Sequence, residues 1–144
     1  MSSLLYEQAL CVAETFDVNL PKNSAVLYSI SYLPTTKNRD DAFDYVKKNK
    51  KAHMIEDTEC GKKLVELGIG YQETGLSQEQ VMHIWGVASR RFITSICGDV
   101  VAFVDGADER SVFRVIELPL LLKNDNVHVI NGMDKHTFAD KFIK

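Results

Sequence analysis

The sequence predicts an α/β fold, in which a small, mainly parallel four-stranded sheet is flanked by helices and preceded by a helical part at the N-terminus. Four short apolar runs are interpreted as buried strands: residues 25–30, 53–55, 100–104 and 127–130. Segments with helical spacing of apolar residues alternate with these runs, as is typical of parallel strands joined by crossover helices. The 144 residues suit one compact domain spanning 1–144.

Four segments have apolar residues at helical spacing and are predicted as helices: residues 4–16, 38–50, 60–67 and 134–143. Pro21 follows the first helix, and Gly68 and Gly70 stop the third. Pro119 is expected to limit any regular structure in the short apolar segment 111–117.

The clearest helix begins at Ser77, which forms a capping box with Gln80. Apolar residues then mark one face as far as Ile96. Trp85 and Ser89 are four residues apart and therefore lie on the same side of this helix. Trp85 is compatible with either a core position or the lining of a pocket.

Composition excludes several classes of function. The net charge of −3 provides no global basic field for nucleic acid. The four histidines lack metal-binding spacing, so no metal site is expected. The three cysteines are far apart and odd in number, which favours buried free thiols. Without a signal-like or membrane-spanning segment, we expect the chain to act in cytosol, either its own or that of a cell into which it is delivered.

Three of the predicted strands end in or run into groups of polar residues. They are Tyr28-Ser29, Glu56-Asp57-Thr58 and Asp105-Gly106. Ligands of such sheets bind beyond the carboxyl ends of the strands. These groups therefore predict a binding site at one edge of the sheet.

Four segments carry a resemblance to a known family. They are residues 54–58 (MIEDT) with Gly61, 84–89 (IWGVAS), 98–106 (GDVVAFVDG) and 111–119 (SVFRVIELP). Together they resemble, in order and spacing, the motifs of the ADP-ribosyl cyclases and NAD glycohydrolases. The resemblance extends from about residue 25 to residue 130.

The resemblance implies a role for each matching residue. Glu117 would be the catalytic glutamate that holds the ribose hydroxyls and faces the cation formed on cleavage. Glu56 would contact the nicotinamide carboxamide and influence the choice between hydrolysis and cyclisation. The implied substrate-binding residues are Trp85, Ser89, Tyr28, Asp57, Ser111 and Phe113.

The sequence also departs from the family pattern. Tyr28 stands where a second tryptophan is usual, and Ile30 replaces an arginine, so phosphate contacts would come from elsewhere, with Arg90, Arg91 or Arg110 as candidates. The family's disulfides and the cysteine-rich insertions after position 67 are absent. The chain thus resembles trimmed, toxin-like modules of bacteria or fungi.

The expected function is an NAD glycohydrolase that splits NAD or NADP into nicotinamide and ADP-ribose, or its cyclic form, with NAD as substrate and no cofactor. Glu56 and the small Val112 favour hydrolysis by analogy. A toxin or effector role, with a cognate immunity or inhibitor protein as partner, is a further expectation. The alternatives are a catalytically silent NAD or ADP-ribose sensor and a protein-interaction domain that shares only the fold.

Overall fold

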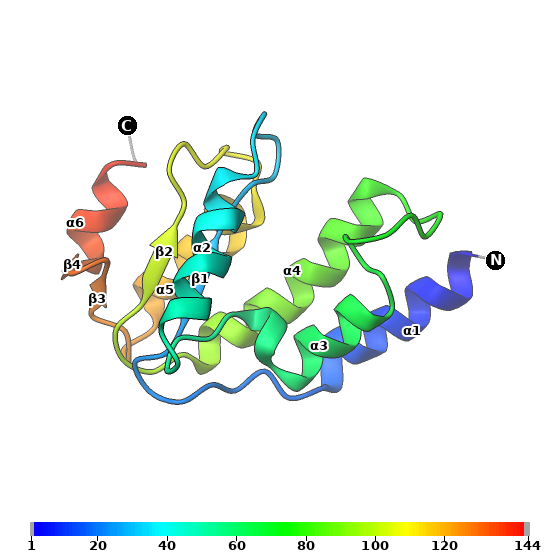
Figure 1. The fold of residues 1–144 in the computed structure, drawn as a ribbon, viewed down its shortest axis with the longest axis horizontal. Coiled ribbons are helices and arrows are strands. Elements are labelled where there is room, and N and C mark those ends of the chain that lie inside the picture. The colour runs from blue at the N-terminus through cyan, green and yellow to red at the C-terminus, as the bar shows by residue number, and fades with distance from the viewer. Residues whose placement is uncertain (1, 143–144) are drawn as a thin grey trace.

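The computed structural model describes residues 2–142 and alternates helices with very short strands (Figure 1). Its elements, in chain order, are α1 (Ser2–Thr15), β1 (Val26–Tyr28), α2 (Lys37–Lys48), a 3₁₀ turn (Ile55–Asp57), α3 (Glu59–Glu66), α4 (Gln78–Ser95), β2 (Val101–Phe103), a π-helical turn (Phe113–Glu117), α5 (Leu118–Lys123), β3 (Val129–Ile130), β4 (Met133–Asp134) and α6 (Lys135–Asp140). Helices α1, α3 and α4 gather at one end of the molecule, while α2 packs against β1 and β2. The α/β class is therefore confirmed.

The predicted four-stranded parallel sheet is wrong. β1 and β2 form a parallel pair, and β3 and β4 form a separate antiparallel pair. The outer predicted strands join β1 and β2 only through single parallel bridges, between Ala25 and His53 and between Val100 and Ile130. Each outer segment turns away at once, the first into the 3₁₀ turn and the second through Asn131, whose φ is 53°. The chain therefore has the predicted order of segments without enough pairing to extend the sheet.

The predicted helices are present with small differences at their ends. The capping box of α4 has both hydrogen bonds: Gln80 N–H donates to Ser77 Oγ at 3.0 Å, and Ser77 N–H donates to Gln80 Oε1 at 2.9 Å. The last helix is shorter than predicted. Asp134 is its N-cap, and α6 spans Lys135–Asp140. Ile143, the predicted end, lies outside the described residues.

Pro119 does not limit regular structure, contrary to expectation. It is the second residue of α5, where the fixed φ of proline is compatible with helical geometry. The π-helical turn runs directly into this helix. Such turns are frequent at functional sites, and this one ends at Glu117.

Two hydrophobic clusters lie on opposite sides of β1. Leu27 belongs to the large cluster with α1, α3, α4 and α5, whereas Val26 belongs to a small cluster beneath α2. Of the three cysteines, only Cys60 is buried, so the expectation of buried thiols is wrong for Cys11 and Cys97. None of the helices within residues 2–142 combines the length and apolarity needed to cross a membrane.

Candidate active site

A cleft of about 280 Å³ opens between the end of β1, the 3₁₀ turn, α4 and the π-helical turn. Six of the eight predicted site residues line it: Tyr28, Glu56, Trp85, Ser89, Phe113 and Glu117. These residues come from four separate segments of the chain. The cleft therefore depends on the fold rather than on any single motif.

Glu117 lines this cleft with only 8% of its surface exposed. Burial raises the pKa of its carboxyl group from the ordinary 4.5 to about 7, the neighbouring Ser89 hydroxyl opposes this rise, and the charge of Glu56 adds to it. A carboxyl group that titrates near neutral pH inside a cleft is a common property of catalytic sites.

Helix α4 contributes Trp85 and Ser89 to the cleft from one face, as their spacing predicts. Ser89 is buried and lies next to Glu117. The Trp85 indole N–H donates to the carbonyl oxygen of Ile69 at 3.0 Å, which fixes the ring against the turn after α3. The half-buried indole therefore both packs against the core and forms a wall of the cleft.

Glu56 accepts two phenolic hydrogen bonds on the same oxygen. Tyr28 Oη lies 2.5 Å and Tyr71 Oη 2.8 Å from Glu56 Oε2. Burial and the charge of Glu56 raise the pKa of both phenols, so both remain protonated donors. The carboxylate of Glu56 is thus held by residues 28 positions before it and 15 after it.

Asp57 does not line the cleft. Its carboxylate accepts the N–H of Met54 at 2.8 Å and lies 3.8 Å from His53 Nδ1, so it stabilises the 3₁₀ turn. Thr58 caps α3 by accepting the N–H of Gly61, where a Cβ would collide with the carbonyl of Ile55. The substrate-contact prediction for Asp57 therefore lacks geometric support in this structure.

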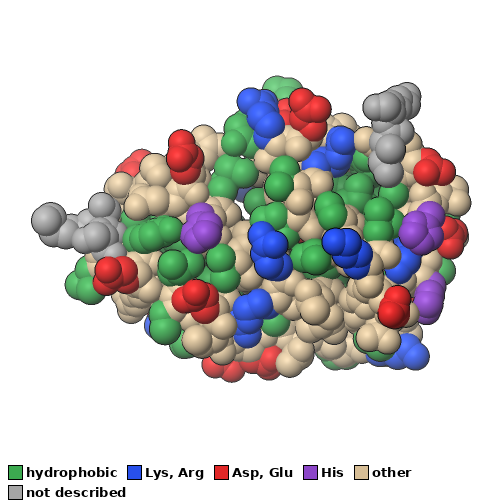
Figure 2. Space-filling model, turned by 180° about the vertical axis from the view of Figure 1, so that it is seen from behind, with side chains coloured by type: hydrophobic (Ala, Val, Ile, Leu, Met, Phe, Trp, Pro, Cys, Tyr) green, Lys and Arg blue, Asp and Glu red, His purple; other side chains and the backbone are tan. Residues whose placement is uncertain are grey.

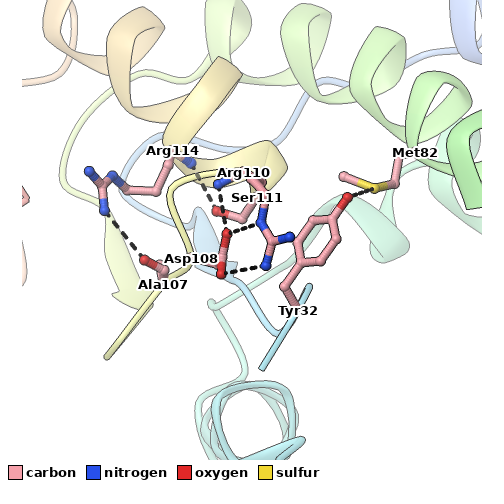
Figure 3. A network of polar contacts seen from close by, with 7 residues as sticks. All are labelled: Tyr32, Met82, Ala107, Asp108, Arg110, Ser111 and Arg114. Carbon is pink, nitrogen blue, oxygen red and sulfur yellow. Dashed lines mark hydrogen bonds and ion pairs between the residues drawn. The ribbon is translucent and has the colours of Figure 1, made fainter. Parts of the chain in front are cut away.

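Ser111 is also outside the cleft. It is fully buried, and its Oγ accepts the N–H of Arg114 at 3.2 Å at the start of the π-helical turn (Figure 3). Its position shapes the segment that carries Glu117 and leaves its hydroxyl away from any ligand in the cleft. Asp105, which follows β2, does not line the cleft either.

The predicted phosphate-contacting arginines lie elsewhere. Arg110 is paired with Asp108 through two nitrogens and stacks on the Tyr32 ring at 4.0 Å (Figure 3). Arg91 donates to the carbonyl of Ala13, and Arg90 is exposed and does not line the cleft. Among the lysines and arginines of the described residues, Arg39 of α2 is the one that lines the cleft.

Sequence reasoning therefore missed Arg39 and Tyr71. Arg39 lies in a charged helix, and Tyr71 in a glycine-rich turn, so neither stands in a pattern that marks a site. The one available signal was that Tyr71 follows Gly68 and Gly70, which permit the chain to turn back after α3.

Other kinds of site find little support. Among residues 2–142, His, Cys, Asp and Glu side chains do not gather in threes in a way that could hold a metal ion. On the face shown in Figure 2, basic side chains are separated by hydrophobic and uncharged ones. That face lacks the continuous basic surface that would follow a nucleic-acid backbone.

The sequence matches no protein-family model and no curated protein. Solved structures with a similar fold are an ADP ribosyl cyclase complexed with N1-cIDPR (TM-score 0.58, 21% identity), porcine CD38 with a covalent intermediate, ribo-F-ribose-5'-phosphate (0.60, 20%), and Aplysia cyclase with substrate NGD and product cGDPR (0.57, 24%). They match 89%, 87% and 89% of this chain, which spans 62%, 66% and 62% of theirs. The resemblance stated from the motifs is confirmed for the fold: the chain has an ADP-ribosyl cyclase-like fold.

Proposed function

We propose that the chain is an NAD glycohydrolase, which cleaves NAD into nicotinamide and ADP-ribose, or NADP into nicotinamide and ADP-ribose 2′-phosphate, through an oxocarbenium-like state stabilised by Glu117. The observation that carries this proposal is the buried Glu117 carboxyl group in one cleft with Glu56 and Trp85. The fold supports it, since the similar structures include an ADP ribosyl cyclase and a cyclase complexed with its substrate NGD.

The proposed chemistry requires a fixed negative charge beside a sugar. Nicotinamide leaves as a neutral molecule from a cationic pyridinium, so positive charge builds on the ribose as the glycosidic bond breaks, as in glycoside hydrolysis. A preorganised carboxylate at that point lowers the barrier by several kcal/mol, about 3 kcal/mol for a single well-placed group. Glu117 is suited to this role because its burial excludes water, which would weaken the interaction.

Binding of the substrate would itself ionise Glu117. With a pKa of about 7, the free carboxyl group is only partly ionised at neutral pH. A pyridinium cation within a few ångströms favours the carboxylate form. The charged pair therefore forms when substrate enters, while the empty cleft is spared part of the cost of a buried charge.

The other lining residues fit parts of the same substrate. Trp85 and Tyr28 offer aromatic surface for the pyridinium ring, where a cation–π contact contributes roughly 0.5–2 kcal/mol. Arg39 offers a positive charge for the pyrophosphate. Water would then capture the ribosyl cation, with Glu56 and the small Val112 favouring hydrolysis over cyclisation.

The experiment follows free nicotinamide released from NAD by purified wild type, Glu117→Gln and the control Glu14→Gln, whose glutamate is exposed on α1. We expect release by wild type and Glu14→Gln, with a loss of at least about 100-fold for Glu117→Gln. Tight NAD binding without turnover by wild type would instead identify a sensor. A wild type that neither binds nor cleaves NAD would favour the alternative of a protein-interaction domain.

Separation of ADP-ribose from cyclic ADP-ribose in the same reaction measures the balance of hydrolysis and cyclisation. The NAD-depleting effector role forms a second part of the proposal. Induction of wild type in a host cell should lower NAD and growth, and Glu117→Gln at equal expression should do neither. Growth inhibition by both proteins would contradict an effector that acts through NAD.

A further inference from the structure

Two tyrosine hydroxyls converge on a single oxygen of Glu56. Tyr28 Oη donates to Oε2 at 2.5 Å and Tyr71 Oη donates to the same atom at 2.8 Å, while the two hydroxyls are 3.2 Å apart. All three side chains line the cleft. The arrangement fixes the plane of the carboxylate more firmly than one hydrogen bond would.

Tyr71 is held in this position by the turn after α3. Gly68 and Gly70 have φ values of 86° and 83°, and the N–H of Tyr71 donates to the Gly68 carbonyl at 3.1 Å. The Trp85 indole holds the same turn through its hydrogen bond to the Ile69 carbonyl. Tyr71 is therefore placed by local backbone geometry and by α4, although 40% of its surface is exposed.

The two oxygens of Glu56 consequently differ. Oε2 already accepts two strong donors, whereas no group in the described part of the chain donates to Oε1. A carboxylate has acceptor capacity on both oxygens. Oε1 is thus the atom of Glu56 that remains for a donor brought in by a ligand.

We propose that Tyr71 is a positioning residue, which together with Tyr28 holds Glu56 so that Oε1 accepts an N–H from the carboxamide of a pyridinium ligand. This inference rests on the proposed function, because it assigns nicotinamide to this part of the cleft. It adds a determinant of specificity: the tyrosine pair selects a flat cation that carries an amide over the same cation without one.

The test uses Trp85, the single tryptophan of the chain, whose fluorescence reports on the cleft directly. Binding of 1-methylnicotinamide and of 1-methylpyridinium is measured by saturable quenching in wild type, Tyr71→Phe and the control Tyr45→Phe. Tyr45 packs against Phe103 in the small cluster and does not line this cleft. Phenylalanine keeps each ring and removes only the hydroxyl.

We expect Tyr71→Phe to weaken binding of 1-methylnicotinamide about tenfold and that of 1-methylpyridinium less than about twofold. Tyr45→Phe should change neither, and Tyr28→Phe should repeat the selective loss. An equal loss for both ligands would show that Tyr71 only shapes the cleft and would overturn the inference. Unchanged binding of 1-methylnicotinamide by Tyr71→Phe would also overturn the inference. Wild type that binds neither ligand would overturn it as well.

Release of nicotinamide from NAD by the same proteins separates this inference from the proposed function. Selective loss of 1-methylnicotinamide binding in a wild type that does not cleave NAD would support the positioning role and refute the glycohydrolase. Cleavage of NAD without any selective effect of Tyr71→Phe would support the glycohydrolase and refute the positioning role.

Discussion

Glu117→Gln should make the folded protein more stable at alkaline pH while it removes activity. The carboxyl group is buried, and its pKa rises from 4.5 to about 7 in the folded chain. Each pKa unit corresponds to about 1.4 kcal/mol. The ionised group therefore costs the folded state about 3 kcal/mol once the pH exceeds 7.

The sign of this effect changes the pH dependence of stability. Well below pH 4.5 the group is protonated in both the folded and the unfolded chain, and its burial has little electrostatic cost. As the pH rises from 4.5 to 7, the unfolded chain ionises first, so the free energy of unfolding falls. Glutamine has nearly the same shape and no charge, so the variant lacks this fall.

Urea unfolding at pH 5 and at pH 8 measures the difference. We expect Glu117→Gln to exceed wild type by about 3 kcal/mol at pH 8 and by less than about 1 kcal/mol at pH 5. Glu14→Gln, which changes an exposed residue, should follow wild type at both. A variant that is no more stable than wild type at pH 8, or that gains equally at both pH values, would refute the electrostatic reasoning.

Three further predictions follow from the geometry. For NAD cleavage, kcat/KM should rise with pH through about 7 as Glu117 ionises. Glu56→Gln should move the inflection of this pH profile to lower pH, because the negative charge of Glu56 no longer raises the pKa of Glu117. An inflection at the same pH in the variant would contradict this. Arg39→Ala should raise KM about tenfold for NAD and leave it unchanged for nicotinamide riboside, which lacks phosphate; equal changes would exclude phosphate contact. Lys135→Met should lower the free energy of unfolding by about 1–3 kcal/mol, because the carbonyls of Leu121 and Asn124 lose the charged one of their two donors; unchanged urea unfolding would refute this.

The helices were predictable from sequence because their signals are local. Ser77 and Gln80 form their reciprocal cap within four residues, and the apolar face of α4 is set by its own spacing. The extent of the sheet was not predictable in this way. Whether residues after His53 continue as a strand depends on the hydrogen bond between Met54 and Asp57, which diverts the chain into a 3₁₀ turn.

The candidate site likewise contains residues that the sequence predicts and residues whose contacts form only in the folded chain. Trp85, Ser89, Glu56 and Glu117 were assigned to the site by the motif resemblance, and helical spacing placed the first two on one face; all four line the cleft. Tyr71 was not predicted, because its contact with Glu56 exists only after the turn and α4 have packed. No pattern within the turn itself reports that distant contact.

The segment 56–58 shows why a motif cannot assign a role to each of its residues. Glu56 points into the cleft, whereas Asp57 accepts the backbone N–H of Met54 and Thr58 caps α3. Acidic and hydroxyl side chains are favoured at a helix start for that reason alone. Two of the three motif residues therefore serve to aim the first, and substituting Asp57 should affect any chemistry only through the placement of Glu56.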